Sequence, residues 1–249
     1  MDLSLDNVKT EIARLREEIE RHNYAYHVLA SPTISDKDYD ELFRRLLALE
    51  RQYPQYDDPN SPTRKVGAPV LEGFRTVPHS TPMLSLDNTY NETDIREFHG
   101  RVVRLLGQSA FTYLCELKID GVSFAARFED GLFVLGITRG NGVEGEDITE
   151  HIRRIPSFPI RLRHPETLEV RGEIFMPKSA FAQINAQREE EGLALFANPR
   201  NAAGGTVRQL DTAVVAKRRL DAFIYHLLDP ERYGLKTQAQ ALDYVRELG

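Results

Sequence analysis

The stretch TYLCELKIDGVSFAARFEDGLFVLGITRG (residues 112–140) decides the fold, because its alternating pattern predicts two strands joined by a tight turn. In a strand, side chains two residues apart point to the same face. Within CELKIDGVSF (residues 115–124), Glu116, Lys118 and Asp120 would therefore share one face. A row of an acid, an amine and an acid on one strand face suggests that these residues serve a function and not only the fold.

A second charged row lies in LEVRGEIF (residues 168–175), where Glu169, Arg171 and Glu173 alternate with apolar residues. A solvated face of an antiparallel sheet also produces such alternation, and taken alone that explanation is the better one. The glycine-rich stretch TRGNGVEGEDIT (residues 138–149) ends the second strand of the predicted hairpin. Charged rows that converge near such a loop favour a pocket that handles phosphate.

The remaining pattern predicts an α+β fold whose larger domain is mostly antiparallel. Apolar residues recur at helical spacing in the N-terminal region, with Ser35 as the expected N-cap of the second helix. Further helices are predicted at residues 91–107, 177–192 and 237–249, and further strands at residues 167–177 and 220–228.

A composition change predicts two domains. Residues 53–74 are rich in proline and glycine, which is typical of a linker. We therefore expect a helical domain over residues 1–70 and an α+β domain over residues 71–249. The last residues look like a helix cut near its close, so the chain is expected to be a fragment whose second domain is incomplete.

Composition narrows the class of protein. The formal net charge of −6 and a pI near 5.7 argue against a chain that clamps nucleic acid over its whole surface. A single cysteine, Cys115, excludes an internal disulfide and a cysteine zinc site, and its place in the predicted strand suggests burial. No apolar run approaches the roughly 20 residues of a membrane helix, so the cytoplasm is the expected compartment.

The segment KIDG (residues 118–121) matches the K-x-D-G signature of covalent nucleotidyltransferases, the DNA ligases, RNA ligases and capping enzymes. CELKIDG, ITRGNGVEGEDIT, LEVRGEIFMP and FANPRNAAGGTVRQLD together resemble the adenylation region of bacterial NAD-dependent DNA ligases. NYAYHVLASPTISDKDYDELFRRLLALE (residues 23–50) resembles the small helical domain that these ligases carry, and PMLSLDNTY (residues 82–90) also matches. The resemblance covers nearly the whole chain.

The resemblance implies a reaction. The lysine at position 118 would attack the α-phosphorus of NAD, form a phosphoramidate with AMP and release nicotinamide mononucleotide (NMN). The AMP would then pass to a 5′-phosphate at a nick in duplex DNA, so nick sealing in replication and repair is implied for the family. Because this chain is expected to be a fragment, we expect its own adenylation to be impaired and nick sealing by it alone to be absent. NAD is then a substrate, and Mg²⁺ or Mn²⁺ is implied as a cofactor, although the residues themselves predict no metal site.

The chemistry fits the residue types. A free lysine has a pKa of about 10.4, so burial or a nearby cation must depress it before the amine can attack. Asp120 could orient the amine or accept its proton, and both remain open. By resemblance Glu116 reads the adenine amino group, Arg139 contacts ribose or phosphate, and Glu173 contacts the ribose hydroxyls. A surface ion pair is the alternative for Arg139 and Glu173.

The helical domain would recognise NMN. An aromatic surface with acids suits a cationic nicotinamide ring and ribose hydroxyls. Core packing is the alternative for the tyrosines, and helix-dipole stabilisation is the alternative for the acid at the start of the second helix. The residues implied here are Tyr26, His27, Asp36, Tyr39 and Asp40, with Ser85 and Leu86 lining the cofactor pocket by resemblance alone.

Arg200 and Arg208 flank two glycines in what is expected to be a flexible basic loop that binds a phosphate of the cofactor or of DNA. An ordinary surface turn is the alternative. Nicked duplex DNA is the expected partner, mainly through domains outside this chain, and no membrane partner is expected. Two other functions remain: an ATP-using ligase or capping enzyme, and a non-catalytic fragment that binds NAD.

Overall fold

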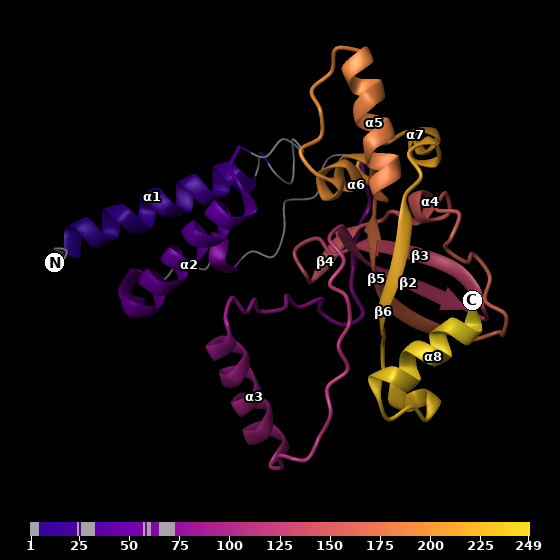
Figure 1. The fold of residues 1–249 in the computed structure, drawn as a ribbon, viewed down its shortest axis with the longest axis horizontal. Helices are drawn as coiled ribbons and strands as arrows, with labels where there is room; N and C mark the ends of the chain where they lie inside the picture. Colours follow the sequence, from indigo (N-terminus) through magenta and orange to yellow (C-terminus); the bar gives the residue numbers. More distant parts are fainter. Residues whose placement is uncertain (1–4, 24, 26–32, 57, 59–60, 65–72) are drawn as a thin grey trace. The chain divides into compact units, whose positions relative to one another are not determined.

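The computed structural model describes residues 5–23, 25, 33–56, 58, 61–64 and 73–249 (Figure 1). The α+β prediction is confirmed, because N-terminal helices precede antiparallel sheets with further helices. The contacts divide the chain into one unit of Met1–Met83 with Ile119–Gly249 and a second unit of Leu84–Lys118. None of the helices in the described ranges has both the length and the apolar character needed to cross a membrane.

The helical part consists of α1 (Leu5–Asn23) and α2 (Asp36–Gln52), followed by the short 3₁₀ helices η2 (Pro54–Tyr56) and η3 (Pro62–Arg64). The predicted N-cap is confirmed, since the Ser35 hydroxyl accepts a hydrogen bond from the Asp38 N–H at 3.2 Å. The two helices pack through one apolar cluster. Its buried members are Val8, Ile12, Leu15, Ile19 and Leu46.

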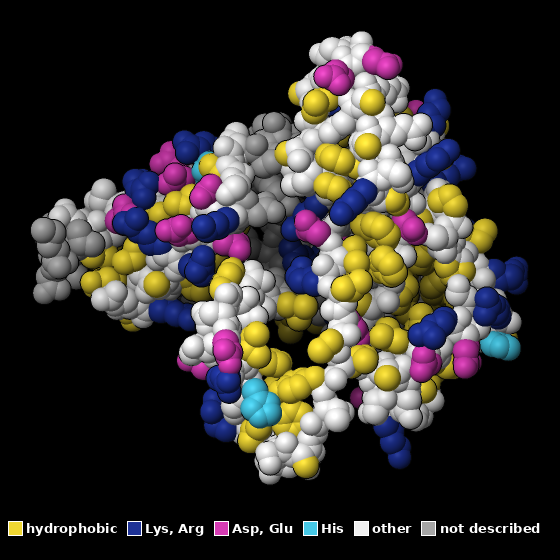
Figure 2. Space-filling view, viewed as in Figure 1, with side chains coloured by type: hydrophobic (Ala, Val, Ile, Leu, Met, Phe, Trp, Pro, Cys, Tyr) yellow, Lys and Arg dark blue, Asp and Glu magenta, His cyan; other side chains and the backbone are white. Residues whose placement is uncertain are grey.

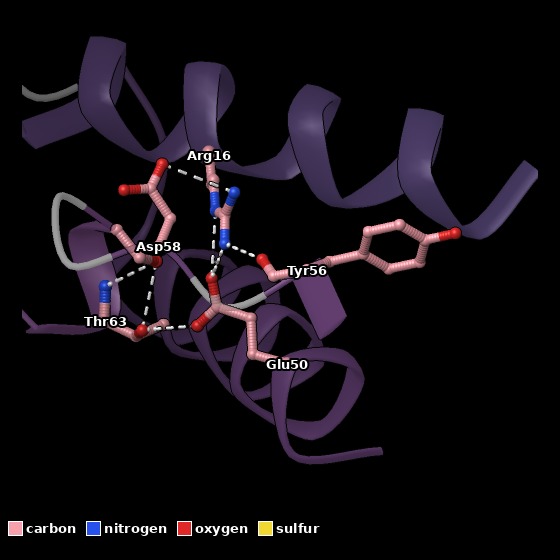
Figure 3. Close-up of polar contacts among 6 residues, drawn as sticks. Arg16, Glu50, Tyr56, Asp58 and Thr63 are labelled. Atoms are coloured by element: carbon pink, nitrogen blue, oxygen red, sulfur yellow. Dashed lines mark hydrogen bonds and ion pairs between the residues drawn. The ribbon is translucent and has the colours of Figure 1, made fainter. Parts of the chain in front are cut away.

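One buried carboxylate ties this helical part together (Figure 3). The guanidinium of Arg16 donates to Glu50 Oε1 at 2.9 and 2.7 Å, and the Thr63 hydroxyl donates to Glu50 Oε2 at 2.5 Å. Arg16 also donates to the Tyr56 carbonyl at 2.7 Å. Burial by itself raises the pKa of Glu50, but the bonds from Ser61, Thr63 and Arg16 outweigh it and lower the pKa below its ordinary value. The segment after α2 is thereby fixed to α1.

The sheet part contains a four-stranded antiparallel sheet in the order β3-β2-β5-β6. Its strands are β2 (Val122–Glu129), β3 (Leu132–Thr138), β5 (Leu168–Phe175) and β6 (Asp221–Leu227). A small sheet pairs β1 (Thr76–Pro78) with β4 (Glu144–Glu146). The predicted hairpin turn is confirmed between β2 and β3.

One face of the four-stranded sheet builds the core. Phe124, Ala126 and Phe128 of β2 and Val170 and Ile174 of β5 point into it, as the alternation predicts. The helices around the sheet are α4 (Thr149–Ile152), α5 (Lys178–Glu190), α6 (Pro199–Val207), α7 (Thr212–Lys217) and α8 (Gln238–Leu248), with the 3₁₀ helix η4 (Pro230–Tyr233) (Figure 1). The predicted helices at 177–192 and 237–249 are confirmed.

The prediction of a flexible basic loop at residues 198–208 is wrong, because this segment forms α6. The Asn198 side chain accepts a hydrogen bond from the Asn201 N–H at 2.8 Å, and Pro199 occupies the first turn, where its missing N–H costs nothing. Ala202 and Ala203 are fully buried. Small side chains let this helix approach the sheet closely, which outweighs the low helix propensity of its two glycines.

The segment Leu84–Lys118 forms its own unit around α3 (Glu92–Leu106), which confirms the predicted helix. Asn91 caps its start and Gly107, in the left-handed conformation, ends it. The helix has no buried residue, and Figure 2 shows hydrophobic side chains at the surface of this segment. Aromatic side chains after the helix turn back on it, since the Phe98 and Tyr113 ring centroids lie 6.0 Å apart.

The prediction that residues 115–121 belong to a strand is wrong. Residues 108–120 have no regular secondary structure, and β2 begins at Val122. The reason is the lack of a neighbour to pair with: β5 pairs with β2 from Val122 onward and ends at Phe175, two residues before a proline. Glu116, Lys118 and Asp120 therefore do not share a strand face. Cys115 is exposed, which contradicts the burial expected for it.

Candidate functional site

The carboxylate of Glu173 on β5 is the centre of the candidate site. Its Oε1 accepts a hydrogen bond from the Gly121 N–H at 3.0 Å, and its Oε2 accepts one from the Ser123 hydroxyl at 2.6 Å. The carboxylate thus joins the start of β2 to β5 through side-chain bonds, where the regular ladder between these strands begins. An ionised carboxylate offers about four acceptor positions, which lets Glu173 serve both of these donors at once.

Gly121 is required for this arrangement. A Cβ at this position would lie 2.0 Å from the Ile174 carbonyl oxygen and 3.1 Å from Phe175 Cα, and both are backbone atoms that cannot swing away. The last residue of the K-x-D-G segment is therefore a glycine for a steric reason. It lets the chain that carries Lys118 and Asp120 enter β2 directly against β5.

Arg139 follows β3 and faces the same carboxylate. Its N–H donates to the Ser123 carbonyl at 2.9 Å, so its backbone is fixed beside the first residues of β2. Burial lowers the pKa of Arg139, and the positive charge of Arg200 lowers it further, while Glu173 and Tyr225 raise it. Among the described residues no ion pair engages its guanidinium. The charges of Arg200 and Glu173 thus both act on Arg139, and a guanidinium in such a setting suits an anionic ligand.

Asp120 and Arg200 form an ion pair at 3.1 Å. The Asp120 side chain is 59% exposed, so the pair adds little stability and acts chiefly on orientation. Arg200 lies in the first turn of α6, and its charge reaches Arg139 as well. Asp120, Arg139, Glu173 and Arg200, which the sequence analysis selected, are therefore brought together near the point where β2 begins and β5 ends.

The sequence analysis missed Tyr225 on β6. Burial raises the pKa of this tyrosine and the charge of Glu173 raises it further, while Ser123, Arg171 and Arg139 lower it. Its ring therefore belongs to the same group. The signal was present in the sequence: Phe223 and Tyr225 alternate with residues that enter the core, so both lie on the opposite face of the sheet. Phe223 also stacks on Phe175, with ring centroids 5.1 Å apart.

The two other charges of the β5 row serve a different purpose. They hold residues 79–83, which we call the 79–83 segment. The Ser80 hydroxyl and Arg127 both donate to Glu169 Oε2 at 2.7 Å, and Arg171 donates to the Thr81 carbonyl at 2.6 Å. The predicted row of Glu169, Arg171 and Glu173 on one strand face is confirmed. Glu169 and Arg171 hold the 79–83 segment, whereas Glu173 belongs to the candidate site.

Arg208, at the C-terminal end of α6, has another partner. Burial lowers its pKa, and the negative charge that opposes this effect is that of Glu146 on β4. Glu146 is itself buried, and its N–H donates to the Thr138 hydroxyl at 2.9 Å. Arg200 and Arg208 thus lie on one helix but face different acids.

The remaining predicted residues belong to other parts of the chain. Ser85, Leu86, Glu116 and Lys118 belong to the 84–118 segment and are exposed. Tyr39 and Asp40 are half-buried on α2, and the Tyr39 ring stacks on Phe43 at 6.2 Å within the helical core. Asp36 is the first residue of α2, whereas Tyr26 and His27 lie outside the described residues.

The described residues contain no group of three or more His, Cys, Asp or Glu side chains that could hold a metal ion. The acids at the candidate site are instead satisfied by protein donors, as Glu173 is by Gly121 and Ser123. The Mg²⁺ or Mn²⁺ implied by the resemblance therefore stays a prediction.

An antiparallel sheet entered by a K-x-D-G segment, with a fixed glutamate and two arginines at the point of entry, defines a nucleotidyltransferase adenylation domain. Residues 71–249 match the family model of the NAD-dependent DNA ligase adenylation domain, and the chain belongs to this family. Residues 5–67 match the family model of the DNA ligase-like N-terminal NAD⁺-binding domain.

Curated relatives agree with this assignment. The chain is 62% identical over 239 residues to the DNA ligase of Thermotoga neapolitana, and the match covers 96% of this chain and 34% of that protein. It is 58% identical over 241 residues to the DNA ligase of Thermosipho africanus, covering 97% of this chain and 36% of that protein. The chain thus spans about a third of the length of these relatives.

Proposed function

We propose that this chain carries out the first step of NAD-dependent DNA ligation, the formation of an enzyme–AMP intermediate. The unprotonated Nζ of Lys118 attacks the α-phosphorus of NAD. A P–N bond forms while the P–O bond to NMN breaks, and NMN leaves with the electron pair on its phosphate oxygen. The Nζ loses its proton to a base or to solvent, which completes a neutral phosphoramidate nitrogen.

One observation carries the proposal. Glu173 is fixed by Gly121, the last residue of the K-x-D-G segment, and shares its electrostatic environment with Arg139 and Tyr225. A nucleotide presents ribose hydroxyls, an aromatic base and an anionic phosphate. Carboxylate, aromatic ring and guanidinium are the groups that recognise these three features. The segment that carries Lys118 therefore leads into a site with the chemistry of a nucleotide-binding pocket.

Each residue takes a role that its contacts permit. The Glu173 carboxylate contacts the ribose hydroxyls, and Arg139 contacts ribose or phosphate. Arg200 binds a phosphate while it holds Asp120, and both roles of Asp120 toward the lysine amine remain open. Glu116 accepts the adenine amino group. Arg208 serves a phosphate of the cofactor or of DNA.

The helical part is proposed to bind the NMN half of NAD. Its matching family is described as an NAD⁺-binding domain, which favours NAD over ATP. The residues proposed for this role are Tyr26, His27, Asp36, Tyr39 and Asp40, with Ser85 and Leu86 in the cofactor pocket. A bound divalent cation would neutralise phosphate charge.

The later steps are also proposals. The relatives are named DNA ligases and are about three times longer than this chain, so DNA binding and sealing are inferred for the whole enzyme. In that reaction AMP passes from Lys118 to a 5′-phosphate at a nick. The neighbouring 3′-hydroxyl then attacks, a phosphodiester bond forms, and AMP leaves.

Intact-protein mass spectrometry tests the proposal. Incubation of the 249-residue chain with NAD and Mg²⁺ should add the mass of one adenylyl group, and ATP should add nothing. Lys118→Ala should abolish the adduct, and so should Lys118→Arg, because a guanidinium stays protonated. Lys178→Ala, at an exposed lysine on α5, is the matched control and should react like the wild type.

Each contrary outcome has a distinct meaning. Peptide mapping that places AMP on another lysine would refute the role of Lys118. NAD binding without any adduct would identify a non-catalytic NAD-binding fragment. An adduct formed from ATP would identify an ATP-using nucleotidyltransferase.

A further inference from the structure

The 79–83 segment is attached at both ends to the glycine-rich loop that follows Arg139. The His79 N–H donates to the Val143 carbonyl at 2.9 Å, and the Met83 N–H donates to the Gly142 carbonyl at 2.8 Å. The first bond continues the β1–β4 ladder, in which Pro78 lies opposite Glu144. The second bond returns the chain to the neighbouring residue of the loop, so the 79–83 segment begins and ends at the same part of the loop.

The opposite side of the 79–83 segment is tied to the large sheet. Glu169 receives the Ser80 hydroxyl, and Arg171 donates to the carbonyls of Thr81 and Pro82 at 2.6 and 3.1 Å. Hydrogen bonds that involve a charged group are stronger than neutral ones. The 79–83 segment is thus a bridge of fixed geometry between β5 and the loop.

One side chain of this bridge reaches Arg139 directly. His79 Nε2 lies 3.1 Å from the Arg139 carbonyl oxygen. A carbonyl oxygen can only accept a hydrogen bond, so Nε2 must carry the hydrogen. Burial lowers the pKa of His79, and it outweighs the backbone of Arg139 and Thr138 and the charge of Glu169, which raise it. The Nδ1 atom is buried without a hydrogen-bond partner among the described residues. Both facts favour a neutral ring with its proton on Nε2.

The backbone of Arg139 is fixed on both sides by these contacts. Its N–H donates to Ser123, and its carbonyl accepts from the Gly142 N–H at 3.0 Å and from His79. The side chain that leaves this residue enters the group formed by Glu173, Arg200 and Tyr225. The direction of the guanidinium therefore depends on the backbone that His79 helps to fix.

We propose that His79 is a positioning residue for nucleotide binding: its Nε2–H holds the Arg139 carbonyl and thereby aims the Arg139 guanidinium at the nucleotide. The proposal rests on the proposed function of the site. His79 itself does not touch the nucleotide. A single hydrogen bond of this kind corresponds to a change of roughly 3- to 10-fold in an equilibrium constant.

Two variants separate the hydrogen bond from the bulk of the ring. His79→Ala removes the donor, whereas His79→Gln places an amide N–H near the position of Nε2. In titration calorimetry with NAD, the 249-residue chain carrying His79→Ala should bind roughly 3- to 10-fold more weakly, and His79→Gln should recover most of this loss. His164→Ala, at an exposed histidine, is the control and should bind like the wild type.

A double-mutant cycle with Arg139→Ala identifies the route of the effect. If His79 acts through Arg139, the His79→Ala effect should disappear in the Arg139→Ala background. Wild-type affinity in His79→Ala would overturn the proposal, and so would a loss of unchanged size in the Arg139→Ala background.

Two measurements without ligand keep this test separate from that of the proposed function. Amide hydrogen exchange at Arg139 and Gly142 should accelerate in His79→Ala and recover in His79→Gln. The imidazole ¹⁵N spectrum of the wild type should show a neutral ring protonated at Nε2. Unchanged amide exchange in His79→Ala would overturn the positioning role, and so would a proton on Nδ1 in the wild-type spectrum. The second measurement uses the wild type, so it decides the question even if His79→Ala does not fold. If the exchange and the spectrum are as expected but the wild type does not bind NAD, the proposed function is refuted and the positioning role is not.

Discussion

Replacing Gly121 by alanine should damage both the fold and the candidate site, because this glycine lies where β2 meets β5. The new Cβ would lie 2.0 Å from the Ile174 carbonyl oxygen and 2.9 Å from its carbonyl carbon. The start of β2 must then move away from β5. That movement also breaks the 3.0 Å hydrogen bond from the Gly121 N–H to Glu173.

The size of the effect follows from these two losses. Forcing an extra methyl group into a packed position costs about 1–3 kcal/mol. Loss of a hydrogen bond to a charged group costs a further 1.5–3 kcal/mol or so. Together the free energy of unfolding should fall by about 3–5 kcal/mol. At about 2–4 °C per kcal/mol for a chain of this size, the melting temperature should fall by roughly 10 °C.

Thermal melting followed by circular dichroism measures this change, and Gly204→Ala is the matched control. Gly204 lies within α6 of the same sheet part, and the nearest atom to a Cβ added there is Val122 Cγ2 at 3.9 Å. This control should be neutral or more stable by about 0.5–1 kcal/mol, since alanine is the better helix former. If the Gly121→Ala chain has the melting temperature of the wild type and also forms the AMP adduct like the wild type, the steric reasoning is refuted.

Three further predictions concern the rest of the chain. The folded-state pKa of Glu50 is lowered, so its carboxylate stabilises the fold above its unfolded pKa of about 4.3, and this contribution is lost as the pH falls through the folded pKa. In urea melts, Glu50→Gln should therefore be less stable than the wild type at about pH 7, and the difference should shrink below about pH 4; a constant difference would contradict this. A chain that lacks residues 1–70 should form no adduct from NAD, and a normal adduct would exclude the helical part as the NMN site. The 249-residue chain, with net charge −6, should bind nicked duplex DNA weakly at about 0.15 M salt in fluorescence anisotropy and seal nothing in a gel assay; tight binding or sealing would contradict this.

The sequence by itself determined the elements that depend on local pattern. The helical spacing in α1, α2, α3 and α5 and the alternation in β5 and β6 are properties of each segment alone, and each element was confirmed. The K-x-D-G segment, together with the longer stretches that resemble the adenylation region, likewise indicated the family before any contact was known, and residues 71–249 match it. Glu173, Arg139 and Arg200 were selected because the segments that carry them resemble those of the family.

Tertiary structure decided the conformation of segments whose local pattern predicts one structure but whose available partners favour another. Residues 115–120 alternate like a strand, yet no strand extends far enough to pair with them, and a strand forms only when its backbone groups find a neighbour. Residues 199–207 contain two glycines, yet they are helical because small side chains let the helix lie against the sheet. The β5 row looked uniform in sequence, but contacts from distant residues divide it between the 79–83 segment and Glu173. Burial and charge at Arg139 and Tyr225 arise only when four strands come together. The alternation in β6 could therefore place Tyr225 on a face of the sheet, but it could not show that the charge of Glu173 acts on it.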